Sequence, residues 1–219
     1  MQTPPPAAAA AWLDTMDGVS RGLNHALSNR VNTLNTLLAV LQENRELDAE
    51  IEGAFMGEEQ RFEALLRLYR LMPLEGVSTS EPMVLIDPVQ DAVALFAHHL
   101  DLRMLPCTVT GLDGAPPVRS RRQALTQAIL VLLVAVGRSL MPSEDKLGLE
   151  LGITFTEDEV LLRASTRRPS AAVDDAAWVA CAWLASTLGA AASCGQGTDG
   201  QAWAMLALPT LLSERKKGR

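Results

Sequence analysis

The chain has 219 residues, with 19 Lys and Arg against 26 Asp and Glu, and its formal net charge at pH 7 is −7. This balance excludes a general nucleic-acid binder, because phosphate contacts require clustered cationic side chains. The widely spaced Cys107, Cys181 and Cys194 form neither a metal pattern nor a disulfide framework, which suits a reducing compartment. No apolar run is long enough for a membrane span, and the first residues lack the basic start of a signal peptide. The sequence predicts a cytoplasmic protein that binds neither nucleic acid nor membrane.

The first third of the chain predicts two antiparallel helices. The first covers about 10–45, after a Pro/Ala-rich lead-in, and one stripe of it carries Leu23, Leu27, Val31, Leu34, Leu38 and Leu41. A polar turn at 42–46 precedes a second helix over 48–72, which Pro73 ends. Its inner face carries Ile51, Phe55, Phe62, Leu65, Leu66, Tyr69 and Met72. Two such helices are half of a four-helix bundle, so the pattern predicts a homodimer in which a second copy covers the remaining apolar stripe.

After a linker at 74–81, the composition predicts a mixed α/β domain. The expected strands are 83–86, 105–110, 147–156, 159–165, 190–194 and 202–208, with a hairpin turn at Glu157-Asp158. The expected helices are 88–102, 119–140 and 175–188. Asp87 is the expected N-cap of the first of these helices, Pro88 its first residue, and Asp174-Asp175 the cap of the last. Trp178, Trp183 and Trp203 are expected to pack in the core. The predicted fold class is therefore α+β.

A polar ridge lies opposite the apolar stripe of the first helix. His25 is two residues from Leu23 and from Leu27, which places it about 200° around the helix from each. The same line continues through Asn29, Asn32 and Thr36. Most exposed histidines on helices are only solvated, so the surrounding architecture carries the interpretation of this one. His98-His99 is expected at the partly buried end of a helix, and the sequence offers no further ligands for a metal there.

The order of elements, a histidine-bearing helical hairpin followed by an α/β sandwich, resembles the sensor histidine kinases. His25 and Asn29 match the family's histidine followed four residues later by Asn or Thr. Residues 123–133 are similar to the helix that carries the family's metal-binding asparagine. The closing helix, glycine turn and final strand are matched by 178–188, Gly189, 195–198 and 206–209. The resemblance implies a dimerisation hairpin over 1–75 that forms a four-helix bundle in the dimer, and a histidine-kinase ATPase-like domain over 76–219.

The residues that handle nucleotide in the family are missing from this chain. Ala135 stands where the metal-binding asparagine is expected, and Thr166 to Ser170 stand where an Asp-x-Gly-x-Gly box is expected. No glycine occurs from Ile153 to Leu188, so the second glycine-rich box is absent, and Ala26 replaces the usual acidic residue after the histidine. We expect no ATP binding, no autokinase activity, and no cofactor or metal of the chain's own. An active kinase with a diverged nucleotide site is the alternative that the missing glycines oppose.

What the resemblance then implies is a histidine phosphotransferase. His25 would relay a phosphoryl group to or from receiver domains of response regulators, with Mg²⁺ supplied by the receiver. Asn29 would orient the phosphoryl group, and the expected partner contacts are Arg21, Ser28, Arg30 and Asn32. A hybrid histidine kinase is a further expected partner. The alternative, from another class, is a non-catalytic adaptor or inhibitor that docks on a histidine kinase or response regulator and does not need His25.

Overall fold

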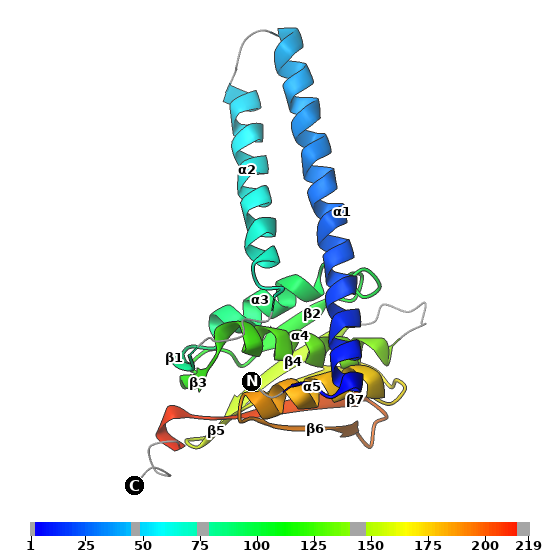
Figure 1. The fold of residues 1–219 in the computed structure, drawn as a ribbon, viewed down its shortest axis with the longest axis vertical. Helices are drawn as coiled ribbons and strands as arrows, with labels where there is room; N and C mark the ends of the chain where they lie inside the picture. Colours follow the sequence, from blue (N-terminus) through cyan, green and yellow to red (C-terminus); the bar gives the residue numbers. More distant parts are fainter. Residues whose placement is uncertain (1–2, 45–48, 74–78, 141–147, 214–219) are drawn as a thin grey trace.

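A long helical hairpin stands on a mixed α/β body (Figure 1). The computed structural model describes residues 3–44, 49–73, 79–140 and 148–213. The hairpin consists of α1 (Pro6–Asn44) and α2 (Ala49–Tyr69). The helices of the body are α3 (Ile86–Phe96), α4 (Arg122–Arg138) and α5 (Asp175–Thr187). Its strands are β1 (Glu81–Met83), β2 (Cys107–Thr110), β3 (Val118–Ser120), β4 (Leu149–Phe155), β5 (Glu159–Thr166), β6 (Ala191–Gln196) and β7 (Ala202–Pro209). The predicted α+β class with an N-terminal hairpin is confirmed.

The main sheet has five strands in the order β2-β4-β5-β7-β6, and β1 pairs with β3 in a separate two-stranded sheet. Only β2 and β4 run parallel in the main sheet, and the other neighbours are antiparallel. The expected turn at Glu157-Asp158 joins β4 to β5. Helices α4 and α5 lie on one face of this sheet (Figure 1). Alternate β5 residues such as Leu162 and Ala164 are buried under them, while Arg163 is exposed on the opposite face.

Helix α4 is the centre of the core. Every residue from Gln123 to Gly137 is buried, because the helix lies between the sheet and the helices around it. A helix that is apolar on all sides is stable in a globular protein only when it is enclosed in this way. Among the described residues, no helix is both long and apolar enough to cross a membrane.

Helix α1 begins at Pro6, earlier than the predicted start near residue 10. Proline is well tolerated in the first turn of a helix, and alanine is the strongest helix former, so the Pro/Ala-rich lead-in is helical. Ala8 and Ala11 are buried. The first turns of α1 lie beside α5 (Figure 1), so this segment, although expected to belong to the hairpin alone, packs on the body.

Two boundaries in the body also differ from the predictions. The predicted strand at 83–86 is β1 at 81–83, and α3 begins at Ile86 after Leu85, which makes no side-chain cap. The predicted N-cap, Asp87, instead lies within the helix and pairs with Arg122 at 3.1 Å. Residues 119 and 120, expected to be helical, pair with β1 in the small sheet, and α4 begins only at Arg122.

Some of the predicted capping and core residues are confirmed, and one is not. Asp174 caps α5 as predicted, because its carboxylate accepts the N–H groups of residues 176 and 177 at 2.9 and 3.2 Å. Trp183 is buried as predicted. Trp203 is half-buried in β7, with the Arg163 guanidinium 5.0 Å from its ring centre. Because residue 163 faces away from the helices, Trp203 lies on the open face of the sheet and not in the core.

Candidate functional site

His25 and Asn29 lie together on the exposed side of α1. Both side chains are exposed, and the amide Nδ2 of Asn29 lies 3.5 Å from Nε2 of His25. When the amide donates to this nitrogen, the ring proton sits on Nδ1 and Nε2 carries the lone pair. In this arrangement the Nε2 lone pair accepts the Asn29 amide, and it becomes free for nucleophilic attack when the amide turns to another acceptor.

Three of the other predicted partner contacts lie close to His25. Arg21 is exposed one turn below His25 and pairs with Asp17 at 3.0 Å. Asn32 is exposed further along the helix, and the exposed Ser28 donates its hydroxyl to the Asn24 carbonyl at 2.9 Å. The structure therefore gathers these polar side chains around His25 along one helix.

Arg30 is not part of this exposed ridge. It lies five residues beyond His25, about 140° around the helix. Its guanidinium contacts both carboxylate oxygens of Glu58 on α2 at 3.0 and 3.1 Å. Glu58 is only 3% exposed and also pairs with Arg61. Arg30, an expected partner contact, is therefore held between the two helices by a buried carboxylate that the sequence did not reveal, and its contact with a partner stays a prediction.

Two glycines let α1 pack closely against the body just below His25. A Cβ at Gly22 would lie 1.6 Å from the carbonyl oxygen of His98, so only glycine permits this approach. One turn lower, the carbonyl of Gly18 accepts the N–H of Leu100 at 3.1 Å. This close contact was not predicted from the sequence. Two glycines four residues apart, on the side of α1 that carries His25, were the pattern that could have indicated it.

A buried glutamine joins the hairpin to the core. Gln127 of α4 is fully buried, and its amide oxygen accepts the indole N–H of Trp12 at 3.0 Å. Its amide nitrogen donates to the carbonyls of residues 71 and 72, just after α2, at 2.9 and 3.0 Å. One side chain thereby ties the start of α1 and the end of α2 to α4.

A buried carboxylate makes a second tie between the hairpin and the body. Asp91 of α3 is 3% exposed and pairs with Arg67 of α2 and, at 2.9 Å, with Arg122 of α4. A buried carboxylate is tolerated only when its charge is paired. The position of α2 over α3 and α4 is therefore set by this cluster.

The segment after β5 closes directly onto α4. Ala135 is fully buried, and its carbonyl accepts the N–H of Asp174 at 3.2 Å. The N–H of Ala171 donates to the Ser139 carbonyl at 3.2 Å, and the side chain of Arg138 pairs with Asp14 of α1. Residues 171–174 are therefore bonded to the C-terminal end of α4. The described residues contain no group of three or more metal-ligating side chains.

The three histidines differ sharply in exposure. His98 is half-buried, and His99 is fully buried instead of partly buried as predicted. Burial, followed by the nearby Arg138 cation, lowers the pKa of His99. Neither ring nitrogen of His99 has a hydrogen-bond partner within the described residues, and the ring packs against Gly18. His25 is therefore the one exposed imidazole in the described chain.

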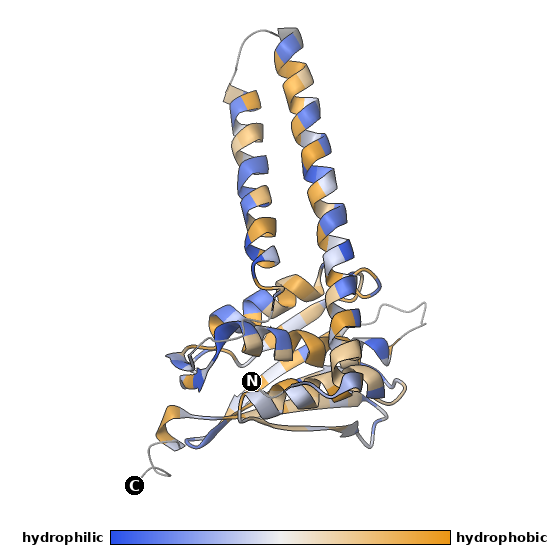
Figure 2. Ribbon diagram, in the orientation of Figure 1, coloured by the Kyte–Doolittle hydropathy of each residue, from blue (hydrophilic) through white to orange (hydrophobic). Residues whose placement is uncertain are grey.

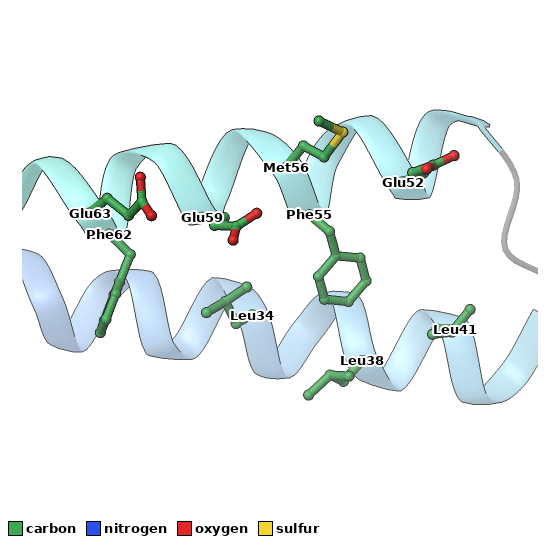
Figure 3. Close-up of a pocket in the computed structure, with 9 residues that line it drawn as sticks. All are labelled: Leu34, Leu38, Leu41, Glu52, Phe55, Met56, Glu59, Phe62 and Glu63. Atoms are coloured by element: carbon green, nitrogen blue, oxygen red, sulfur yellow. The ribbon is translucent and has the colours of Figure 1, made fainter.

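The upper part of the hairpin carries an apolar groove of about 670 Å³ (Figure 3). In Figure 3, Phe55 and Phe62 of α2 reach toward α1, whose Leu34, Leu38 and Leu41 line the other side. Figure 2 shows hydrophobic residues along both helices at this height. In the predicted apolar stripe, Leu23 is fully buried, but Leu38 is 46% exposed. The single chain covers this stripe only at its lower end.

No family model and no curated protein matches the sequence. Solved structures of histidine kinases are similar to the chain. The Acinetobacter baumannii histidine kinase AdeS is 13% identical, covers 85% of this chain and 98% of its own, and has a TM-score of 0.47. A histidine kinase from Burkholderia phymatum STM815 is 14% identical, covers 94% of this chain and 98% of its own, and has a TM-score of 0.46. Because these values are low, the function of the chain has to be inferred from its own residues.

Proposed function

We propose that the chain is a histidine phosphotransferase, in which His25 relays a phosphoryl group to or from receiver domains of response regulators. The observation that carries this proposal is the exposed His25–Asn29 pair, with Nε2 of the imidazole 3.5 Å from the amide nitrogen. The resemblance of the hairpin and its histidine to those of sensor histidine kinases supports the choice of partner.

The transfer needs little from this chain. The lone pair of Nε2 attacks the phosphorus of a receiver's aspartyl phosphate, a P–N bond forms, the P–O bond breaks, and the aspartate carboxylate leaves. The proton on Nδ1 stays in place during this step. The Asn29 amide turns from Nε2 to donate to a phosphoryl oxygen, which frees the Nε2 lone pair for the attack, and the receiver supplies Mg²⁺ with its own acidic side chains. The exposed position of His25 lets the receiver enclose the reacting atoms.

The contacts around Ala135 support transfer without ATP. Its carbonyl bonds to the N–H of Asp174, and the neighbouring Ser139 carbonyl bonds to the N–H of Ala171. Ala135 has no side-chain oxygen or nitrogen with which to hold Mg²⁺ where the resemblance expects an asparagine. We therefore propose that the α/β body is a structural base and that phosphate enters and leaves only through His25.

The groove on the upper hairpin supports a homodimer. Its lining is mainly apolar side chains of both helices, together with Glu52, Glu59 and Glu63 of α2, and Met56 at its edge is 55% exposed. A second hairpin laid against the groove completes a four-helix bundle and removes this surface from water. Because the groove begins at Leu34, nine residues beyond His25, dimerisation leaves the ridge near the body open.

Phosphate transfer from receiver domains tests the proposal. Receiver domains labelled with radioactive phosphate are mixed with the wild-type chain, His25→Ala and Leu212→Ser in the presence of Mg²⁺ and without ATP. Acid-labile label is expected on the wild type and on Leu212→Ser, whose changed residue is exposed beyond the last strand of the body, and none on His25→Ala. Receiver binding without label transfer to any of the three would identify the adaptor alternative instead. Label transferred from ATP by the chain alone would identify an active kinase.

A further inference from the structure

From the geometry around His25, we infer that the turn after α3, residues 97–105, is a second docking surface for the same receiver domain, with Met104 as its apolar anchor. This inference rests on the proposed function and names a part of the partner surface that lies on the α/β body. It assigns the body a role in selecting the partner.

The turn is held against the face of α1 that carries His25. The backbone of His98 touches Gly22, and the Leu100 N–H bonds to Gly18 at 3.1 Å. Gly18 lies seven residues before His25, two helical turns lower and within about 20° of it around the helix. Figure 1 shows the chain after α3 passing beside α1 at the foot of the hairpin. The turn therefore forms a ledge directly beneath His25.

Met104 is the most prominent apolar side chain on this ledge. It is 84% exposed, more than any other large hydrophobic side chain in the described chain, whereas the nearby Leu102 is buried. The turn is compact, because the N–H of Arg103 bonds to the His99 carbonyl at 2.9 Å and that of Leu105 to the Leu102 carbonyl at 2.9 Å. Met104 is thus held outward by a fixed backbone, and a projecting thioether adapts well to a partner's apolar pocket.

His25 and the turn are close enough to each other to lie within one protein interface. Seven residues of helix between Gly18 and His25 amount to about 10 Å. The four residues from Leu100 to Met104 span at most about 14 Å even if fully extended. A standard protein interface buries about 800 Å² on each partner, which corresponds to a patch about 30 Å across. A globular partner that encloses His25 from this side therefore also covers the turn.

The receiver fits this surface better than a second copy of the chain does. The apolar groove that suits a second copy begins at Leu34, about 14 Å above His25 along α1, whereas the turn lies below His25. The turn also has charges of both signs, since Asp101 and Arg103 shortly precede Met104 and are exposed. A mixed polar rim around one apolar side chain is typical of a transient interface.

The test compares Met104→Ser with Leu212→Ser, because Leu212 is also exposed, at 53%, and lies beyond the last strand of the body. Transfer from a phosphorylated receiver domain is measured over a range of receiver concentrations, and His25 is separately labelled with phosphoramidate, a small phosphoryl donor. Met104→Ser is expected to raise the half-saturating receiver concentration at least fivefold, with an unchanged maximal rate and unchanged phosphoramidate labelling. Leu212→Ser is expected to match the wild type.

Several results would overturn the inference. A half-saturating concentration within twofold of wild type would remove Met104 from the interface, and an equal rise in both variants would show a general surface effect. A changed dimer affinity in Met104→Ser would assign the turn to a second copy. If phosphoramidate labels His25 but no receiver does, the proposed function fails and this inference fails with it. If Met104→Ser leaves phosphoryl transfer from the receiver unchanged, the inference about the turn is wrong and the proposed function stands.

Discussion

The two halves of α1 differ in how their apolar side chains are covered. Below His25, Ala8, Val19 and Leu23 are completely shielded from solvent by the rest of the chain. Above it, Val31 and Leu38 are each 46% exposed, although they continue the same stripe. The lower half is packed within a single chain, whereas the upper half has only α2 beside it.

This difference shows what each half of the hairpin requires. The lower half of the hairpin is held on the body by contacts within one chain. These are the close packing at Gly18 and Gly22, the Gln127 hydrogen bonds and the Asp91 cluster. In the upper half, the helices are joined by the Arg30–Glu58 ion pair, in which only the carboxylate is buried, and by a partly open apolar seam. His25 lies at the border, where a fixed base meets the part of the hairpin that we expect to dimerise.

The largest expected effect is on assembly through the upper half. Leu38→Glu places a carboxylate in the apolar groove of each copy, so that two charges are desolvated in every dimer. We expect the dimer to weaken by about 100-fold or more, which corresponds to about 3 kcal/mol. Analytical ultracentrifugation measures this change. A monomeric wild-type chain at micromolar concentration, or an unchanged dimer in the variant, would remove the four-helix bundle from the proposal.

Arg30→Glu breaks the ion pair that joins the upper helices. It places a second carboxylate against Glu58, which is 3% exposed, and we expect a loss of about 3 kcal/mol in the free energy of unfolding. Arg21→Glu is the control, because the Arg21–Asp17 pair is exposed and its loss should cost less than about 1 kcal/mol. Denaturant titration gives both values, and equal losses would contradict the structural role of Arg30.

Gly22→Ala tests the packing of α1 against the α/β body. The added methyl group would overlap the His98 carbonyl, so α1 must lift from the body, and we expect a loss of about 2 kcal/mol. Gly57→Ala in α2 is the matched control, since an added Cβ there meets no described atom within 4 Å. That substitution should stabilise the helix by about 0.5–1 kcal/mol. We expect Gly22→Ala to lower the melting temperature and Gly57→Ala to raise it. A higher melting temperature in both variants would contradict the close packing of Gly22 against the His98 carbonyl.

The smallest effect is the pH dependence contributed by His99. Burial lowers its pKa in the folded state, so the unfolded chain takes up a proton more readily. Stability should therefore fall as the pH drops below about 6.5, the ordinary pKa of histidine. The groups around His99 are Asp14, Arg21, Asp101 and Arg138. His99→Phe should reduce the difference between the melting temperatures at pH 7.5 and pH 5.5, and an unreduced difference would contradict this contribution of His99.

Periodicity and capping chemistry predicted most of the elements. The steps of three and four in α1 and α2, the hairpin turn at Glu157-Asp158 and the cap at Asp174 depend on neighbours in the sequence, and the structure has them all. The exposure of His25 and Asn29 also follows from helix pitch alone.

Contacts between distant segments could not be predicted in the same way. Arg30 meets Glu58, and Gly22 meets His98, only after the helices have packed. Trp203 looked like a core residue because its type favours burial, but the strand register places it on the open face. The short β1–β3 pair displaced the start of α4 for the same reason, since pairing overrides helix periodicity over two residues.

Nitrogen-15 and phosphorus-31 NMR of the wild-type chain, mixed with a phosphorylated receiver domain and Mg²⁺ in the absence of ATP, tests the central claim most directly. The account predicts one phosphoramidate signal, coupled to Nε2 of His25 and absent from His25→Ala. A signal that persists in His25→Ala, or no signal on a wild-type chain that binds the receiver, would contradict it.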